Sequence, residues 1–275
     1  MSPETIQSPE AIQLDVAFLP SDLEETDVAV VVDVLRATST ITQALASGYR
    51  AVHCAPSIEA ARELSAPGRL LAGEQHCLPV PGFDLGNSPA ALARGEVGGT
   101  AGGDVGGTEL VLATTNGTPA IVAAAQRAEL VLMGCLLNLD ALLAAIPSGV
   151  SVTVVCSGTD GRFALEDAYV AGRIVGRLAG EPSDAARAAI CVAGAYPGAI
   201  GPLTDSADGQ KLQSTGQEAD IAWCAQESVL DLVPRVTSDG ADAPVVGAPP
   251  PESVPTGQSN SQSLMNKVVS PTCMF

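Results

Sequence analysis

Histidine and aromatic side chains are scarce in this chain of 275 residues. The sequence holds 2 histidines, His53 and His76, and only 3% of its residues are aromatic. Metal centres rich in imidazole ligands and Ser-His-Asp catalysis therefore have little support. A hydrophobic content of 46% allows a sizeable core, but that core must be built from Ala, Val, Leu and Ile. Such a core suits helices packed on a sheet better than an aromatic-rich β-sandwich.

Basic residues are few as well. Against 31 Asp and Glu the chain has 13 Lys and Arg, which gives a formal net charge of -18. Affinity for nucleic acid and for anionic membranes comes from clustered Lys and Arg, so the composition argues against both classes of partner. An anionic substrate would need a local exception, such as a bound cation or a few well-placed arginines.

Long apolar runs and paired cysteines are also missing. No apolar stretch approaches the ~20 residues that a membrane span needs, and residues 1–13 lack the apolar stretch of a secretory signal. The 7 cysteines include no Cys-x-x-Cys pair, and most lie in apolar runs, where reduced cysteine behaves as a small hydrophobic residue. We expect a soluble, cytoplasmic protein; the sequence leaves a homo-oligomer open.

The chain does contain an alternation of strand and helix patterns. Val28-Ala-Val-Val-Val32 is typical of a strand buried on both faces inside a parallel sheet. Similar strands are expected near 14–19, 50–55, 69–74, 110–114, 129–134 and 151–156, with helices between most of them. This order predicts an α/β fold with a largely parallel sheet. The stretch 230–236 is predicted as a last, edge strand, because Pro234 cannot donate to a ladder.

Composition also predicts the boundaries of the domain. A polar tail covers 1–13 and one domain covers 14–240. The Gly-rich segment 95–108 is interpreted as a flexible surface insertion. Residues 241–275, rich in Ala, Pro, Ser and Gln without periodicity, are predicted to be a disordered tail.

Polar residues follow the buried strand 28–32. Asp33 and Arg36 lie at its carboxyl end, just before a helix N-terminus. In open α/β sheets ligands bind there, and exposed N–H groups favour anions. A carboxylate and a guanidinium three residues apart suggest a phosphate-handling site. The alternative is that Asp33 caps the strand end and pairs with Arg36.

Three other strand ends repeat this design. Glu74 ends one strand, while another runs into Thr114, Thr115, Asn116 and Gly117 at the start of a helix. The hydroxyls, the amide and the backbone at Gly117, which no side chain crowds, could form a neutral binding site for an anion. Alternatively, these residues could be ordinary helix caps.

The fourth strand end carries both charges. Gly158, Asp160 and Arg162 follow the strand 151–156, and Asp167 lies in the first turn of the next helix, on its apolar face. We favour a cleft-facing carboxylate for Asp167 over a dipole-stabilised cap.

A Pro- and Gly-rich loop adds Asp84, Asn87 and Ser88. Loops carry function more often than cores do, although Asp84 and Asn87 could merely satisfy backbone groups in a turn. If the sheet is parallel, all these residues converge at one edge. Several carboxylates with hydroxyls and an amide are hard oxygen ligands, which suit magnesium better than zinc.

Cys156 raises the alternative of a phosphocysteine intermediate. Cys156 ends the apolar run 151–156, where a reduced cysteine behaves as a small hydrophobic residue. We interpret Cys156 as a core residue.

Several motifs in one order resemble the 2-phosphosulfolactate phosphatase family: DVLRATST at 33–40, AGE at 72–74, GFDLGNSP at 82–89, TTNGT at 114–118 and CSGTDGRF at 156–163, followed by Glu166 and Asp167. The resemblance implies a three-layer α/β/α sandwich with a mixed, largely parallel sheet. It also implies a magnesium-dependent hydrolase that converts 2-phosphosulfolactate to sulfolactate and phosphate, a step associated with coenzyme M synthesis. Gln75 stands where we expect Arg in such proteins.

With this resemblance, roles can be assigned as hypotheses. The expected Mg²⁺ ligands are Asp33, Glu74, Asp160 and Asp167. Arg36 is expected to bind the phosphate through two N–H groups of its guanidinium, and Arg162 to bind the sulfonate or carboxylate end. The other expected substrate-binding residues are Asn87, Ser88, Thr114, Thr115, Asn116, Gly117 and Gly158. Asp84 or Asp167 is the expected general base. Two alternatives are a phosphatase for another small anionic phosphoester and a non-catalytic anion-binding protein.

Overall fold

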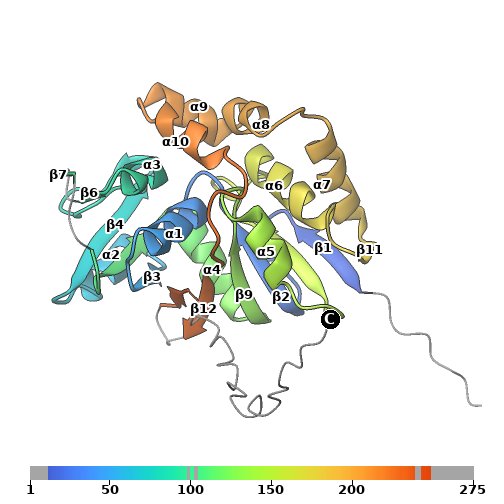
Figure 1. Cartoon of the computed structure of the whole chain (residues 1–275), viewed down its shortest axis with the longest axis horizontal. Coiled ribbons are helices and arrows are strands. Elements are labelled where there is room, and N and C mark those ends of the chain that lie inside the picture. The colour runs from blue at the N-terminus through green and yellow to red at the C-terminus, as the bar shows by residue number, and fades with distance from the viewer. Residues whose placement is uncertain (1–11, 98–99, 102–104, 239–242, 249–275) are drawn as a thin grey trace, which may run out of the picture.

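An 11-stranded sheet with the strand order β11-β1-β10-β2-β9-β12-β13-β3-β8-β4-β5 forms the centre of the molecule (Figure 1). The computed structural model describes residues 12–97, 100–101, 105–238 and 243–248. The strands are β1 Gln13–Ala17, β2 Thr26–Val32, β3 Ala51–Ala55, β4 Arg69–Gln75, β5 Leu78–Pro79, β8 Glu109–Ala113, β9 Ala128–Gly134, β10 Val152–Cys156, β11 Glu181–Pro182, β12 Arg235–Ser238 and β13 Val245–Gly247.

Helices connect most of the strands. They are α1 Ala37–Ala46, α2 Ile58–Glu63, α3 Pro89–Ala93, α4 Gly117–Ala125, α5 Leu139–Ala145, α6 Leu165–Val175, α7 Asp184–Gly194, α8 Ile200–Asp205, α9 Ala207–Ser214 and α10 Glu218–Cys224. Pairs such as β10–β2, β2–β9 and β3–β8 are parallel, whereas β12 and β13 pair antiparallel with their neighbours. The predicted α/β fold with a mixed, largely parallel sheet is confirmed.

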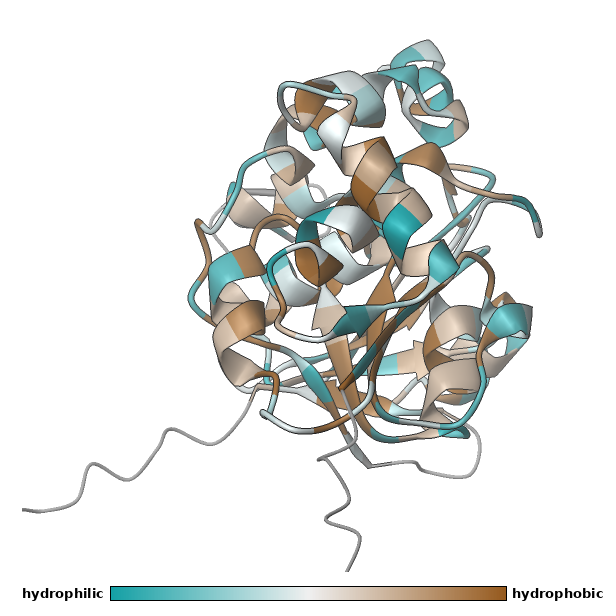
Figure 2. Cartoon of the chain, turned by 90° about the vertical axis from the view of Figure 1, so that its right-hand side faces the viewer, coloured by the Kyte–Doolittle hydropathy of each residue, from teal (hydrophilic) through white to brown (hydrophobic). Residues whose placement is uncertain are grey.

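Alternate residues of β2 pack into two separate hydrophobic cores. Val28, Val30 and Val32 lie in the core that includes residues of α5, α6 and α7. Ala29 and Val31 lie in the other core, with residues of α1 and α4. Helices therefore cover both faces of the sheet, which explains why the strand is apolar at every position. In Figure 2 the central strands are mostly brown, the colour of hydrophobic residues.

Two serines and a glycine define three helix ends. The side chains of Ser57 and Ser88 accept hydrogen bonds from the third backbone N–H of α2 and α3 respectively. Gly48 follows α1 with a φ of +100° and donates its N–H to the carbonyl of Leu45. Glycine tolerates this left-handed conformation, which ends the helix.

The predicted edge strand at 230–236 is wrong in its position. β12 begins at Arg235 and lies in the interior of the sheet, between β9 and β13. Pro234 precedes the strand, and its carbonyl accepts a hydrogen bond from the N–H of Met133 at 2.8 Å between N and O. A proline lacks only its own donor, so its carbonyl can still join an interior strand to its neighbour.

The domain extends beyond the predicted boundary at residue 240. Val245–Gly247 form β13, which pairs with both β12 and β3, and the side chain of Val246 is fully buried. The prediction of a disordered tail is therefore wrong for these residues. A strand of three residues is too short to show periodicity in the sequence. Residues 249–275 lie outside the described part of the chain, as do residues 1–11 of the predicted N-terminal tail; Gln13 already belongs to β1.

The Gly-rich segment 95–108 is only partly a surface insertion. It forms a short antiparallel hairpin of β6 Glu96–Val97 and β7 Thr100–Ala101. Val105, by contrast, is buried in the core that contains α1. Residues 98–99 and 102–104 lie outside the described ranges.

The carboxyl ends of β2, β4, β8 and β10 carry the residues that build the site. Helices α8, α9 and α10 lie together at the top of Figure 1, above the loops that follow these strands. Over the residues that the structure describes, no helix is both long and apolar enough to cross a membrane.

Candidate active site

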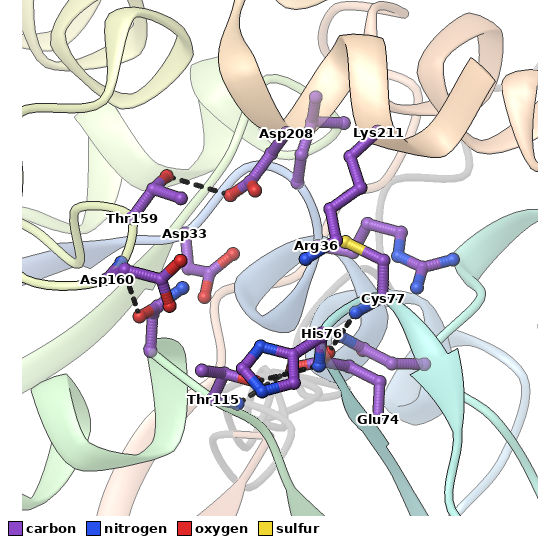
Figure 3. A pocket seen from close by; sticks show the side chains of 13 residues that line it. Asp33, Arg36, Glu74, His76, Cys77, Thr115, Thr159, Asp160, Asp208 and Lys211 are labelled. Carbon is purple, nitrogen blue, oxygen red and sulfur yellow. Dashed lines mark hydrogen bonds between the residues drawn. The ribbon is translucent and has the colours of Figure 1, made fainter. Parts of the chain in front are cut away.

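One pocket collects polar side chains from four strand ends and one helix of the C-terminal half. It has a volume of about 380 Å³, including open solvent at its mouth. Its lining consists of Asp33, Leu35, Arg36, Glu74, His76, Cys77, Asn87, Thr115, Asn116, Thr159, Asp160, Asp208 and Lys211 (Figure 3). Seven of these residues were predicted from the sequence: Asp33, Arg36, Glu74, Asn87, Thr115, Asn116 and Asp160.

Asp33 lies on the floor of this pocket, directly after β2. Its Oδ1 accepts the N–H of Ala37 at the start of α1, at 3.0 Å between N and O. Its Oδ2 faces Gly117, where a Cβ would lie only 2.3 Å from that oxygen. Gly117 therefore provides the space in which the carboxylate fits against the N-terminus of α4.

Burial dominates the protonation of Asp33. It raises the pKa of this carboxyl from 3.8 to about 7, and the nearby Asp208 and Glu74 add to the rise, whereas the bond from Ala37 opposes it. A carboxyl that titrates near neutrality in a polar pocket is a feature of functional sites.

Arg36 lines the pocket but is held by other residues. One of its terminal nitrogens, Nη1, lies 2.5 Å from Asp220 Oδ2 and 2.6 Å from Gln217 Oε1, and the side chains of the ion pair are 2% and 3% exposed. The other oxygen of Asp220 accepts the hydroxyl of Ser88 and the N–H of Ala90. The predicted alternative, a pair between Arg36 and Asp33, does not form.

Glu74 holds two strand ends together. Its Oε1 accepts the N–H of Thr115 at 2.7 Å and its Oε2 accepts the N–H of Cys77 at 2.6 Å, each measured between N and O. Both oxygens are thus engaged by the backbone that forms the wall of the pocket.

The opposite wall comes from the loop after β10 and from α9. The N–H of Asp160 donates to Asn116 Oδ1, and the hydroxyl of Thr159 donates to Asp208 Oδ2 at 2.9 Å between the oxygens. Burial raises the pKa of Asp208, and the hydrogen bond from Thr159 opposes that shift. Figure 3 shows the carboxylates of Asp33 and Asp160 both pointing into the pocket.

Asp167 is buried beneath the pocket and does not line it. Its Oδ1 accepts the N–H of Val34, and its Oδ2 accepts the hydroxyl of Ser157 and the N–H of Gly158. Asp167 thus joins the ends of β2 and β10, which explains its place on the apolar face of α6. The interpretation of a cleft-facing carboxylate is therefore wrong.

Glu166, next to Asp167, is a buried acid with an unused oxygen. Its Oε2 has no hydrogen-bond partner among the described residues. Burial raises its pKa to about 7, with Asp208 and Asp33 adding to the rise. Glu166 is therefore a further titratable group close to the site.

Three other predicted site residues are placed in structural roles outside the pocket. Asp84 is exposed and its Oδ2 accepts the N–H of Leu71, which matches the alternative of a carboxylate that satisfies a turn. Thr114 accepts the N–H of Thr118 in α4, which matches ordinary helix capping. Ser88 caps α3 and donates to Asp220.

Gly158 and Arg162 also lie outside the pocket lining. Gly158 has a φ of +67°, and a Cβ there would lie 2.6 Å from the carbonyl oxygen of Arg162. The Arg162 side chain is exposed. Arg162 bonds to the pocket residue Thr159 through its backbone only, and its side chain is not part of the pocket lining.

The two cysteines nearest this chemistry differ in position. Cys156 is 1% exposed and belongs to the hydrophobic core, and burial raises its pKa well above the usual value. This placement agrees with its interpretation as a core residue. Cys77 lines the pocket instead, and burial raises the pKa of its thiol to about 11.

Sequence reasoning missed five polar residues of the pocket: His76, Cys77, Thr159, Asp208 and Lys211. For Lys211 a signal was available, because the chain has only two lysines, Lys211 and Lys267. Asp208 lies in a polar stretch without a motif, and only the packing of α9 over the strand ends brings it to the pocket.

The donor set suits a hard cation that water and substrate help to coordinate. Magnesium takes oxygen ligands and usually keeps several waters, with one or two carboxylates and substrate phosphates. Asp33 and Asp160 supply two carboxylates, and Asn87 Oδ1 is buried without a hydrogen-bond partner among the described residues. No group of three or more His, Cys, Asp or Glu within the described ranges is arranged to hold a metal on its own.

Known proteins resemble this chain over most of its length. The sequence profile of a family described as 2-phosphosulpholactate phosphatase matches residues 16–239. A probable 2-phosphosulfolactate phosphatase of Thermus thermophilus is 38% identical over 230 residues, which cover 81% of this chain and 94% of that protein. A protein of the same name from Deinococcus radiodurans is 38% identical over 243 residues, with coverage of 85% and 96%.

Proposed function

Because the chain belongs to the 2-phosphosulpholactate phosphatase family, we propose that it hydrolyses 2-phosphosulfolactate to sulfolactate and phosphate. Membership of this family makes it a phosphoric monoester hydrolase. The observation that carries the proposal is the convergence of Asp33, Asp160, Asp208, Arg36 and Lys211 on one pocket. In a protein with a net charge of -18, the two cations of this pocket, together with a metal ion held by its carboxylates, would supply the local positive charge that an anionic substrate needs.

The proposed enzyme depends on magnesium, and the structure narrows the choice of ligands. Both oxygens of Glu74 and of Asp167 are engaged by backbone or hydroxyl donors. We therefore reduce the four predicted ligands to Asp33 and Asp160. A magnesium ion held there would neutralise charge on the phosphoryl group and polarise a water.

The chain's own residues would bind the phosphate and accept a proton. Arg36, fixed by Asp220, and the N-terminus of α4 both favour an anion beside Asp33. Asp208, whose pKa is raised by burial, lines the same pocket and is the proposed general base in place of Asp84 and Asp167. Phosphate-ester hydrolysis depends mainly on such positioning and charge stabilisation.

Phosphate release from a panel of small phosphoesters, with magnesium and with EDTA, tests the proposal. We expect release from 2-phosphosulfolactate that EDTA abolishes. Absence of release at every magnesium concentration would refute the proposed activity, and release from another ester alone would select the alternative phosphatase. Binding without turnover would select the anion-binding protein.

A matched pair of variants tests the role of Asp33. We expect Asp33→Asn to abolish the metal-dependent activity and Asp22→Asn, at an exposed position in a 3₁₀ turn, to retain it. Unchanged activity of the first variant would remove Asp33 from the ligand set. We place the reaction in coenzyme M synthesis, which requires that the host make this coenzyme; a host that does not would contradict this placement.

A further inference from the structure

Lys211 is a cation of the pocket that lies close enough to Asp208 to oppose the rise that burial causes in the pKa of that carboxyl but forms no ion pair among the described residues. It lies on α9, half-buried, and in Figure 3 its side chain extends from the helix into the pocket. Its ammonium has no ion pair within 4.0 Å among the described residues. Asp208 lies one turn earlier on α9 but bonds to Thr159 instead.

Arg36 differs from Lys211 in this respect. Its guanidinium is paired with Asp220 and bonded to Gln217 in a buried setting. The position of Arg36 is therefore fixed by α10, and part of its charge is already balanced. Lys211 forms no such ion pair among the described residues, so its ammonium is available to a ligand.

The proposed metal ligands Asp33 and Asp160 lie in a different part of the pocket from Arg36. Figure 3 shows Asp33 and Asp160 on one side of the pocket and Arg36 on the other, next to Cys77; Glu74 lies below Cys77, and Lys211 extends from α9 beside Asp208. Burial raises the pKa of the Cys77 thiol; Asp208 and Glu74 add to the rise, whereas Arg36 and Lys211 oppose it. Asp208 also lies close enough to Asp33 to add to the rise that burial causes in the pKa of the Asp33 carboxyl.

A substrate with two anionic ends would span this division. The reacting phosphate belongs beside Asp33 and Asp160, where a metal ion would balance its charge. A second anion could not lie among the carboxylates, since like charges repel at short range. The ammonium of Lys211, which forms no ion pair among the described residues, is the group that can receive it.

We propose that Lys211 binds the carboxylate or sulfonate of the substrate that is not transferred, and so makes the enzyme selective for phosphoesters that carry a second anion. The inference rests on the proposed function and sharpens its substrate class. It also replaces Arg162, the sequence-based candidate for this end of the substrate, because that side chain is exposed and outside the pocket.

Direct binding of the two products tests this inference without turnover. Isothermal titration calorimetry with sulfolactate and, separately, with inorganic phosphate would compare the wild type, Lys211→Met and Arg162→Met in magnesium buffer. Methionine keeps the length and the helix propensity of lysine, so the fold should persist; an unchanged circular dichroism spectrum would verify this. We expect Lys211→Met to weaken sulfolactate about 10–100-fold, the effect of one charge-assisted hydrogen bond, and phosphate much less.

Arg162→Met is expected to leave both affinities close to wild type. Equal losses for sulfolactate and phosphate in Lys211→Met would assign Lys211 to the phosphate instead and refute the inference. A loss of sulfolactate binding in Arg162→Met alone, or in neither variant, would refute it as well. Binding is measured on the products, so it requires no turnover. If the wild type binds sulfolactate through Lys211 but does not hydrolyse phosphosulfolactate, the proposed activity is refuted and the role of Lys211 in binding is not.

Turnover measurements give a second test of the role of Lys211. The ratio of kcat/KM for 2-phosphosulfolactate to that for glycerol 2-phosphate, which has no second anion, is expected to fall about 10–100-fold in Lys211→Met. The change should lie mainly in KM. An unchanged ratio would contradict a role in selecting the second anion.

Discussion

Close packing around Asp33 illustrates how single residues set this site. The carboxylate is held by the N–H of Ala37 and confined by Gly117. Gly117, interpreted from the sequence as part of an anion-binding site, thus leaves room for the Asp33 carboxylate because it has no side chain. Such a contact is invisible in a motif, because the two residues lie far apart in the chain.

A methyl group at position 117 is expected to damage both stability and activity. In Gly117→Ala the new Cβ would lie 2.3 Å from Asp33 Oδ2 and 2.3 Å from the Ala37 Cβ. We expect unfolding in urea to show a loss of about 1–3 kcal/mol, typical of overpacking, together with a large fall in kcat. Gly194→Ala is the matched control, since nothing lies within 4 Å of a Cβ there. Equal stability of the two variants would contradict the close packing.

The buried acids predict an unusual dependence of stability on pH. The pKa of Asp33 rises from 3.8 to about 7 on folding. Between these values the folded state holds a proton that the unfolded state has released, so the free energy of unfolding falls as pH rises from about 4 to 7 and levels off above. Each pKa unit corresponds to about 1.4 kcal/mol, an upper bound for a site that can relax.

Thermal unfolding in EDTA would measure this effect. We expect the wild type to have a lower Tm at pH 8 than at pH 5.5, and Asp33→Asn to show a smaller difference. Glu166, whose pKa also rises to about 7, should leave part of the slope in place. A slope identical in wild type and Asp33→Asn would show that Asp33 is not the titrating group.

At the scale of elements, α10 connects three parts of the site. Asp220 on this helix pairs with Arg36 before α1 and accepts bonds from Ser88 and Ala90 at the start of α3. Gln217, just before α10, bonds to Arg36 and to the carbonyl of Cys77. The helix therefore positions the guanidinium and the loops around it.

Breaking this buried pair is expected to be costly. Asp220→Asn keeps the shape but leaves the charge of Arg36 unbalanced, which typically destabilises a protein by about 3–5 kcal/mol. Glu227→Gln, which removes the partly exposed pair with Arg173, should cost less than about 1 kcal/mol. Urea unfolding compares the two variants. Similar losses would mean that Asp220 does not anchor the site.

At the scale of the whole molecule, the C-terminal strands join two parts of the sheet. β12 pairs with β9 and β13 pairs with β3, so this antiparallel pair fills the space between two sets of parallel strands. Val246 is fully buried in the core that contains α1 and α4. The last described residues therefore belong to the centre of the fold.

Two truncations test that conclusion. A chain that ends at residue 240, the boundary predicted from composition, lacks β13 and should be insoluble or have a Tm lowered by about 10 °C or more, since several kcal/mol are lost. A chain that ends at residue 248 should keep the fold. Circular dichroism melting curves compare both with the full chain; equal Tm values would show that β13 is dispensable.

The sequence by itself determined the α/β class, the family and the polar strand ends, because each of these depends on short patterns of neighbouring residues. Asp33, Glu74 and Asp160 could be named as members of one site because the carboxyl ends of parallel strands meet at one edge. The tertiary structure decided which of them remain available to a ligand. It engages both oxygens of Glu74 and Asp167 in local bonds and brings Asp208 and Lys211 to the pocket on α9. It also places β12 and β13 inside the sheet. These outcomes depend on contacts between segments far apart in the chain, for which local periodicity and spacing hold no information.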